Sequence, residues 1–135
     1  MDNRKIMLDT SAYSSFLRGH DKIKFAIQIS DEIFINPIVI GELLSGFVMG
    51  KNEERNREIL RKFLKSSRVN VAAIGEETSE RYAAIINYLR KNGTPIPSND
   101  IWIAASAMEY GLKVITTDKH YLNIPLIITE FYDLQ

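Results

Sequence analysis

The stretch Lys5-Ile6-Met7-Leu8-Asp9-Thr10-Ser11-Ala12 decides how the rest of the chain is interpreted. It begins with an apolar run that is typical of a short strand buried in a parallel sheet. The run ends on Asp9, and a helix is predicted from about Ser11 to Leu17, with Ser11 as its candidate N-cap. An aspartate in this position lies at the carboxyl end of a strand, where open α/β sheets form their ligand-binding crevice.

The alternation of strand and helix continues along the chain. Further strands are predicted at residues 32–35, 68–71, 113–116 and 125–129, and further helices at residues 21–30, 38–49, 51–66, 75–92 and 99–110. All strands except 68–71 are rich in apolar residues, as strands buried on both faces should be. We therefore predict an α/β fold with a central parallel sheet of about five strands, covered by helices on both faces.

The composition is that of an ordinary globular protein. The chain has 135 residues, which suggests one domain over residues 1–135. It has no cysteine, so disulfides and thiolate metal sites are excluded. We see no secretory signal and no apolar run near the roughly 20 residues that cross a bilayer, so we expect a cytoplasmic protein without a membrane partner. The 17 basic and 17 acidic residues give zero formal net charge, which argues against nucleic-acid binding by bulk charge alone.

Two acids stand out because of the elements that carry them. Asp9 follows the first strand, where it could also serve only to cap the next helix. Glu42 lies in the helix at 38–49, which starts after Asn36-Pro37 and is apolar on nearly all sides. A carboxylate in such surroundings is costly unless it is paired, protonated or bound to a metal. We therefore interpret Glu42 as functional rather than as a residue that points out through a gap.

Two further acids are expected at the edge of the sheet where parallel α/β folds place their functional residues. Asp100 is in the first turn of the helix that Ser98 is expected to cap, where the helix dipole alone favours an acid by roughly 0.3–1 kcal/mol. Asp118 follows the strand at 113–116, where it could instead cap the turn that comes next. Each of these acids, taken alone, therefore has a purely structural explanation.

The four acids together are more specific than any one of them. Strand carboxyl ends and helix N-termini lie at the same edge of a parallel sheet, so we expect one cluster of Asp9, Glu42, Asp100 and Asp118. Four oxygen donors without a cysteine or a well-placed histidine favour Mg²⁺ or Mn²⁺ over zinc. The two histidines, His20 and His120, are interpreted as surface residues rather than as ligands or general bases.

The segments that carry these acids resemble the successive motifs of the PIN domain, and more narrowly those of the VapC ribonuclease toxins of prokaryotic toxin–antitoxin pairs. The segments are Asp9-Thr10-Ser11, Asn36 to Gly46, Asn99 to Ala105, and Thr116 to Tyr121. Their order, their spacing and the length of the chain agree with that family, so the resemblance covers the whole chain. One departure is Tyr121, which stands where a phenylalanine is common and which we expect to affect packing more than chemistry.

The resemblance implies a Mg²⁺- or Mn²⁺-dependent endoribonuclease. By position, the acidic quartet of the family matches Asp9, Glu42, Asp100 and Asp118, and the hydroxyls that support the acids match Thr10, Ser11 and Thr116. The family's roles make Asp9 and Asp100 the main metal ligands. The resemblance also implies an RNA substrate, a homodimer, and inhibition by a cognate antitoxin protein whose tail enters the acidic groove.

Substrate contacts are assigned on weaker grounds. Basic residues outnumber acidic ones between residues 51 and 68, so Arg55 and Arg61 are candidate phosphate contacts, although a solvated helix face explains the same charges. Arg18 and Lys119 lie closer in sequence to the proposed site and are the alternative candidates.

Three rival functions were weighed against the nuclease. A haloacid-dehalogenase-like phosphatase needs a second aspartate two positions after the first, and that position is Ser11. A phospho-receiver domain needs an aspartate after a middle strand, and residues 69–72 offer none. The alternative that stays open is a non-cleaving PIN-like module that binds RNA or protein, although four intact acids argue against it.

Overall fold

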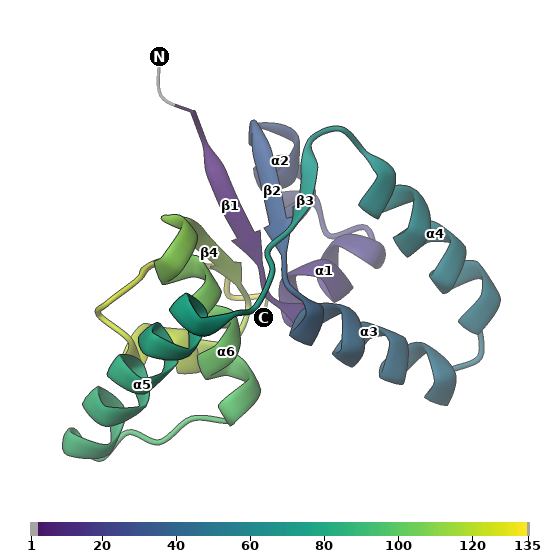
Figure 1. The fold of residues 1–135 in the computed structure, drawn as a ribbon. Helices are drawn as coiled ribbons and strands as arrows, with labels where there is room; N and C mark the ends of the chain where they lie inside the picture. Colours follow the sequence, from purple (N-terminus) through teal and green to yellow (C-terminus); the bar gives the residue numbers. More distant parts are fainter. Residues whose placement is uncertain (1–2, 135) are drawn as a thin grey trace.

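A computed structural model describes residues 3–134 and shows a parallel sheet of five strands (Figure 1). The order across the sheet is β3-β2-β1-β4-β5, and each neighbouring pair is parallel. The strands are β1 (Lys5–Leu8), β2 (Glu32–Ile35), β3 (Val69–Val71), β4 (Lys113–Thr116) and β5 (Ile128–Phe131). The predicted fold class is confirmed.

Helices cover both faces of this sheet. The described residues contain the α-helices α1 (Thr10–Leu17), α2 (Asp21–Gln28), α3 (Pro37–Met49), α4 (Glu53–Lys65), α5 (Glu76–Lys91) and α6 (Ser98–Tyr110), and the 3-10 helix η1 (Lys119–Asn123). Helices α5 and α6 pack against each other, while α1 contacts both α2 and α3, and α3 contacts α4 (Figure 1). Helix α3 also contacts α6, so it lies where the two groups of helices meet.

Strand β1 is the centre of the sheet, and it is buried as its sequence predicts. Its residues Ile6, Met7 and Leu8 have no exposed surface, because β2 and β4 pair with the two edges of β1 and helices cover its faces. Successive side chains of a strand point to opposite faces. Met7 is level with Phe34 of β2, and the ring of Tyr110 in α6 stacks on Phe34, so this face is covered by α6.

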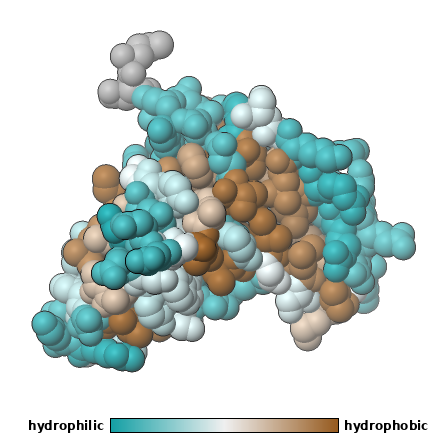
Figure 2. Space-filling model, in the orientation of Figure 1, coloured by the Kyte–Doolittle hydropathy of each residue, from teal (hydrophilic) through white to brown (hydrophobic). Residues whose placement is uncertain are grey.

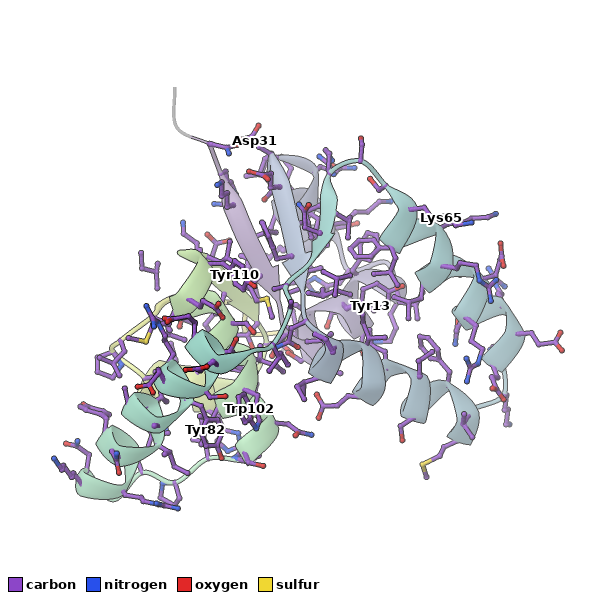
Figure 3. The ribbon with its side chains drawn as sticks, viewed as in Figure 1. Tyr13, Asp31, Lys65, Tyr82, Trp102 and Tyr110 are labelled. Atoms are coloured by element: carbon purple, nitrogen blue, oxygen red, sulfur yellow. The ribbon has the colours of Figure 1, made fainter. Side chains whose placement is uncertain are left out.

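Aromatic side chains fill the core on the side of α1. The rings of Tyr13 in α1 and Phe63 in α4 meet edge to face with centroids 5.2 Å apart. Figure 3 shows Tyr13 between these helices, and Tyr82 beside Trp102 where α5 meets α6. The rings of Tyr82 and Trp102 stack at 4.2 Å. Trp102 is therefore half-buried and packs between α5 and α6.

Two helix starts differ from the prediction. Asp9, and not Ser11, is the N-cap of α1, because its carboxylate accepts a hydrogen bond from the backbone N–H of Ala12 at 2.8 Å. Ser98 is the first residue of α6 rather than its cap, and Pro97 precedes it without a side-chain cap bond. Asn36 and Pro37 do start α3 as predicted, with Asn36 accepting from Val39 N–H at 3.0 Å.

The last strand was predicted too early and too deeply buried. Strand β5 is Ile128–Phe131 rather than 125–129, because η1 and a turn at Pro125 and Leu126 occupy the preceding residues. It is an edge strand, and Ile128 is 67% exposed. An apolar run alone does not distinguish a central strand from an edge strand. The two differ in whether a neighbouring strand pairs with each edge, and the composition of the strand itself does not show this.

Helix α3 is less buried than its apolar sequence suggests. Val39, Leu43 and Phe47 form its buried face, while Val48 and Met49 near its end are 58% and 86% exposed. Figure 2 shows apolar side chains gathered on the surface near α3 and α4. Within residues 3–134, no helix is both long enough and apolar enough to span a membrane.

Candidate active site and metal centre

The four acids predicted to cluster lie on four different elements at one edge of the sheet. Asp9 follows β1, Glu42 lies in the second turn of α3, and Asp100 is in the first turn of α6. Asp118 follows β4 and is the N-cap of η1. Because β1 and β4 are paired neighbours in the sheet, the first and last of these acids follow adjacent strand ends.

Asp9 is held in place by hydroxyl groups. It is only 3% exposed. Its carboxylate accepts a hydrogen bond from Thr116 Oγ1 at 2.6 Å, and Ser11 Oγ lies 2.8 Å from both of its oxygens. Burial raises the pKa of Asp9 to about 6, in spite of the hydrogen bonds from Thr116, Ala12 and Ser11, and the charge of Asp100 adds to the rise. The fold thus keeps a carboxylate where it is costly to ionise without a cation.

Thr116 and Ser11 also organise the chain that leads to Asp118. Thr116 Oγ1 accepts from the backbone N–H of Asp118 at 2.9 Å, and Ser11 Oγ accepts from the backbone N–H of Thr117 at 3.1 Å. The hydroxyls of two distant segments therefore fix Asp9 and the turn after β4 together. The supporting role that the resemblance implies for these hydroxyls agrees with this geometry.

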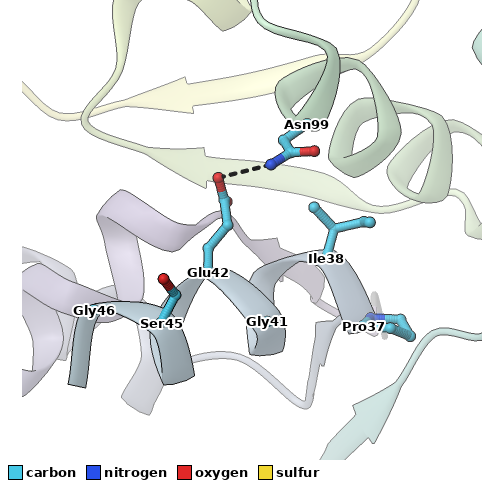
Figure 4. A pocket seen from close by; sticks show the side chains of 7 residues that line it. All are labelled: Pro37, Ile38, Gly41, Glu42, Ser45, Gly46 and Asn99. Carbon is cyan, nitrogen blue, oxygen red and sulfur yellow. Dashed lines mark hydrogen bonds between the residues drawn. The ribbon is translucent and has the colours of Figure 1, made fainter. Parts of the chain in front are cut away.

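Glu42 is oriented from two sides. Thr10 Oγ1 donates to Glu42 Oε1 at 2.6 Å, and the Asn99 side-chain amide donates to Glu42 Oε2 at 3.2 Å (Figure 4). Glu42 lies between two hollows of the surface, of about 650 Å³ and about 430 Å³, and it lines both of them. It is half-buried rather than enclosed by the apolar residues of α3, so it reaches solvent at the edge of the site.

The pKa of Asp100 depends on the charges of other acids in the cluster. Burial, followed by the charges of Asp118 and Glu42, raises the pKa of Asp100 to about 6. The hydroxyl of Tyr121 donates a hydrogen bond to Asp100 Oδ1 at 3.4 Å. Tyr121 is fully buried, and burial together with the charges of all four acids raises the pKa of its phenol. The four carboxylates therefore lie near enough for their charges to act on Tyr121.

His120 lies against the same cluster, which the sequence interpretation did not expect. Its ring Nδ1 is 3.0 Å from Asp118 Oδ1 and 3.6 Å from Asp100 Oδ2. Asp100, Asp118 and His120 each offer a ligand atom, and these atoms lie within 4.8 Å of one another. His120 is exposed, as predicted, and its ring nitrogen nevertheless lies close to two of the predicted acids.

The charge of the cluster suits a divalent cation. Within residues 3–134, none of the four acids forms an ion pair with a lysine or an arginine, and His120 is the only basic partner of Asp100 and Asp118. Closely spaced carboxylates without such partners repel one another, and hard cations such as Mg²⁺ and Mn²⁺ bind to oxygen donors of this kind. The residues present fit the cation that the sequence implies.

The candidate substrate contacts divide into two pairs. Arg18 lines the hollow of about 430 Å³ together with Glu42, and Lys119 lines a hollow of about 530 Å³ together with Asp118. Arg55 lines a hollow that none of the four acids shares. Arg61 pairs with Glu58 on the same face of α4. The first pair is therefore adjacent to the acids, and the second is not.

Three residues of the site were missed or undervalued from the sequence. Asn99 stood in a motif without a role, yet it orients Glu42. Tyr121 was expected to affect packing more than chemistry, yet its hydroxyl points to Asp100. His120 follows Asp118 by two residues, and that short spacing was the signal that could have found it.

Comparison with known proteins defines the class of this fold and site. The family model of the PIN domain matches residues 6–126. The chain therefore belongs to the PIN-domain family.

Within this family the chain falls among the VapC proteins. Ribonuclease VapC of Rickettsia bellii is 33% identical to it over 123 residues, which cover 89% of this chain and 90% of that protein. Ribonuclease VapC4 of Mycobacterium tuberculosis is 29% identical over 126 residues, which cover 93% and 95%. A structure of VapBC2 from Rickettsia felis bound to a promoter DNA fragment matches with a TM-score of 0.84 and 26% identity, covering 96% of this chain and 99% of that chain. DNA-bound VapBC from Salmonella typhimurium matches with a TM-score of 0.82 and 27% identity, covering 95% and 98%.

Proposed function

We propose that this chain is an endoribonuclease that depends on Mg²⁺ or Mn²⁺ and is the toxin of a VapBC-type toxin–antitoxin pair. The observation that carries the proposal is the convergence of four carboxylates from four separate elements, with no lysine or arginine paired to them in the described part of the chain. RNA is the proposed substrate because the curated relatives are named ribonucleases.

The four acids are the proposed ligands of the cation. Asp9 and Asp100 are its main ligands, and Glu42 and Asp118 complete the site or orient the attacking water. When bound, the cation neutralises charge on a phosphodiester and makes water more acidic. Hydrolysis by water should leave 5′-phosphate and 3′-hydroxyl ends on the RNA.

The neighbouring polar residues prepare the acids for this role. Thr116 and Ser11 hold the Asp9 carboxylate in one orientation, and Thr10 and Asn99 do the same for Glu42. Such fixed carboxylates need little rearrangement when a cation and a phosphate enter, which is how preorganised sites lower a barrier. Tyr121 contributes a hydroxyl that faces Asp100.

The substrate and the protein partners complete the proposal. Arg18 and Lys119, which share hollows with the acids, are the preferred phosphate contacts over Arg55 and Arg61. A cognate antitoxin is proposed because solved structures of similar fold are described as VapBC complexes. We further propose that the chain acts in the cytoplasm as a homodimer.

Cleavage of a structured RNA by the purified protein tests the nuclease proposal. Asp9→Asn and Asp100→Asn should each lower the cleavage rate about 100-fold or more, since residues that merely support metal ligands are typically worth about 10–100-fold. Asp21→Asn is the matched control, because Asp21 is an exposed acid at the start of α2 and is not one of the four acids. Cleavage should require Mg²⁺ or Mn²⁺ and stop with a chelator.

The outcome separates the nuclease from a non-cleaving PIN-like module. No cleavage by the wild type, or equal cleavage by wild type and both variants, would remove the nuclease proposal and leave RNA or protein binding. Glu42→Gln tests one assignment separately. Unchanged metal affinity and unchanged turnover in this variant would show that Glu42 is not part of the site.

A further inference from the structure

The proposed function assigns no role to His120, although its side chain lies against the acidic cluster. Its imidazole is 49% exposed, and its Nδ1 atom faces both Asp118 and Asp100, at 3.0 Å and 3.6 Å. Within residues 3–134, these three residues form the one group of three or more histidine and acidic side chains whose ligand atoms all lie within 4.8 Å of one another, and Asp9 and Glu42 lie outside that group.

The backbone around His120 fixes this arrangement. The backbone N–H of His120 donates to Asp118 Oδ1 at 2.9 Å, so the carboxylate and the imidazole are held by the same turn. The next residue, Tyr121, is fully buried and donates to Asp100. Consecutive residues of η1 therefore contact both acids. The backbone of η1 therefore fixes the position of the imidazole beside the two acids.

We propose that His120 Nδ1 is a ligand of the cation, beside Asp100 and Asp118, and that it biases the site toward Mn²⁺ over Mg²⁺. Carboxylates and water suit both Mg²⁺ and Mn²⁺, and an imidazole nitrogen is a better ligand for a first-row transition-metal ion such as Mn²⁺ than for Mg²⁺. This inference rests on the proposed function in one respect, namely that the acids hold a cation.

The proton balance of this ligation is simple. A histidine binds a metal as neutral imidazole, with one nitrogen on the metal and the proton on the other. Here Nδ1 faces the acids, so the proton is carried by Nε2. The partly exposed ring allows Nε2–H to donate to water. A cation bound at this site would be held by His120 Nδ1 together with the carboxylates of Asp100 and Asp118.

Electron spin-echo spectroscopy of protein-bound Mn²⁺ tests the ligand directly, because it detects imidazole nitrogen bonded to the ion. The chain has two histidines, so only His20 and His120 can give this signal once any histidine tag is removed. We expect nitrogen modulation in the wild type and in the control His20→Gln, and its loss in His120→Gln. Modulation that persists in His120→Gln, or is absent from the wild type, would overturn the proposal.

Metal affinity without RNA tests the selectivity. Titration calorimetry should show that His120→Gln weakens Mn²⁺ binding by about tenfold and weakens Mg²⁺ binding less. Equal losses for both ions would overturn the bias toward Mn²⁺. Asp100→Asn separates the two proposals. If Mn²⁺ binding depends on Asp100 but shows no nitrogen signal, only the role of His120 fails. If binding is independent of Asp100, the proposed metal centre itself fails.

Discussion

At the scale of single residues, Asp9 has two tasks that the sequence presented as alternatives. It caps α1 through the Ala12 N–H, and it is also the most buried acid of the candidate centre. Asp118 likewise caps η1 and faces Asp100. A cap places a carboxylate at a helix N-terminus, and in this fold the helix N-termini surround the site. The structural explanation of these acids is therefore compatible with the functional one.

Thr116 gives the sharpest residue-scale prediction. Its hydroxyl donates to buried Asp9 and accepts from Asp118 N–H. Thr116→Val keeps the shape of the side chain but leaves a buried carboxylate and an N–H short of a partner. We expect the free energy of unfolding to fall by about 1–3 kcal/mol, measured by urea denaturation, together with weaker metal binding.

Thr116→Ser is the matched control, because it retains the hydroxyl. It should recover most of the metal affinity even if it loses some packing. If Thr116→Val were as stable as the wild type and bound Mn²⁺ equally well, the hydroxyl would have no supporting role.

At the scale of elements, α3 has an unusual face of small residues beside Glu42. Gly41, Ser45 and Gly46 line the hollow of about 650 Å³ with Pro37 and Asn99. Figure 4 shows Glu42 pointing across this face toward Asn99. A Cβ atom added at Gly41 or Gly46 would meet nothing within 4 Å. These glycines are therefore not required by packing, and they keep the approach to Glu42 open.

Substitution of two glycines by alanine should have opposite effects on stability. Gly41→Ala should raise the free energy of unfolding by about 0.5–1 kcal/mol, because glycine in a helix interior costs backbone entropy. Gly111 ends α6 at a φ of 67°, so Gly111→Ala should lower it by about 1–2 kcal/mol. Thermal and urea unfolding of both variants check this, and a loss of stability in Gly41→Ala would contradict the absence of packing neighbours at Gly41.

The elements also show where sequence interpretation succeeds. Strand β2 was predicted to the residue and the start of α3 within one residue, because Asn36-Pro37 favours the boundary by two independent preferences. Strand β5 was misplaced, since Pro125 to Ile128 has the composition of a strand but Pro125 and Leu126 form a turn. The cap of α1 was misassigned by two residues because both Asp9 and Ser11 suit that position.

At the scale of the whole molecule, a polar network joins the two ends of the described chain. Glu130 of β5 contacts Arg4 at 3.0 Å and Lys113 at 3.5 Å, and it accepts a hydrogen bond from Tyr132 at 2.5 Å. Burial alone would raise the pKa of Glu130. The hydrogen bonds from Tyr132 and Arg4, with the charges of Arg4 and Lys113, outweigh it and lower that pKa.

The network makes stability depend on pH in a defined direction. Because the folded-state pKa of Glu130 is below its unfolded value, its contribution is present above the ordinary glutamate pKa and is lost as pH falls through the folded value. Glu130→Gln should therefore lower the free energy of unfolding by about 1 kcal/mol at neutral pH. The difference from wild type should shrink toward zero in acid.

Glu77→Gln is the comparison for this measurement. Glu77 is 69% exposed and pairs with Arg81 along α5, so its loss should change stability by less than about 0.5 kcal/mol. A Glu130→Gln effect that is equally small, or that grows as pH falls, would contradict the assigned role of the network.

The acids of the candidate site could be predicted from the sequence, but most of their hydrogen-bond partners could not. The four acids were found because parallel strands and helix N-termini share one edge, which is a property of the topology. The partners of the acids were found only where a family motif named them. Contacts such as Asn99 with Glu42, or His120 with Asp100, join residues whose side-chain directions no periodicity specifies.

The position of β4 in the sheet has a consequence for the synthesis of the protein. The central strand β1 is made first, but its neighbour β4 is made only after α6, and Thr116 and Asp118 come with it. A ribosome-bound chain that ends before β4 lacks the strand that pairs with one edge of β1. It also lacks Thr116, which donates a hydrogen bond to Asp9, and Asp118, which is one of the four acids. The four acids that converge in the folded protein are therefore all present only after β4 and the turn behind it have been synthesised.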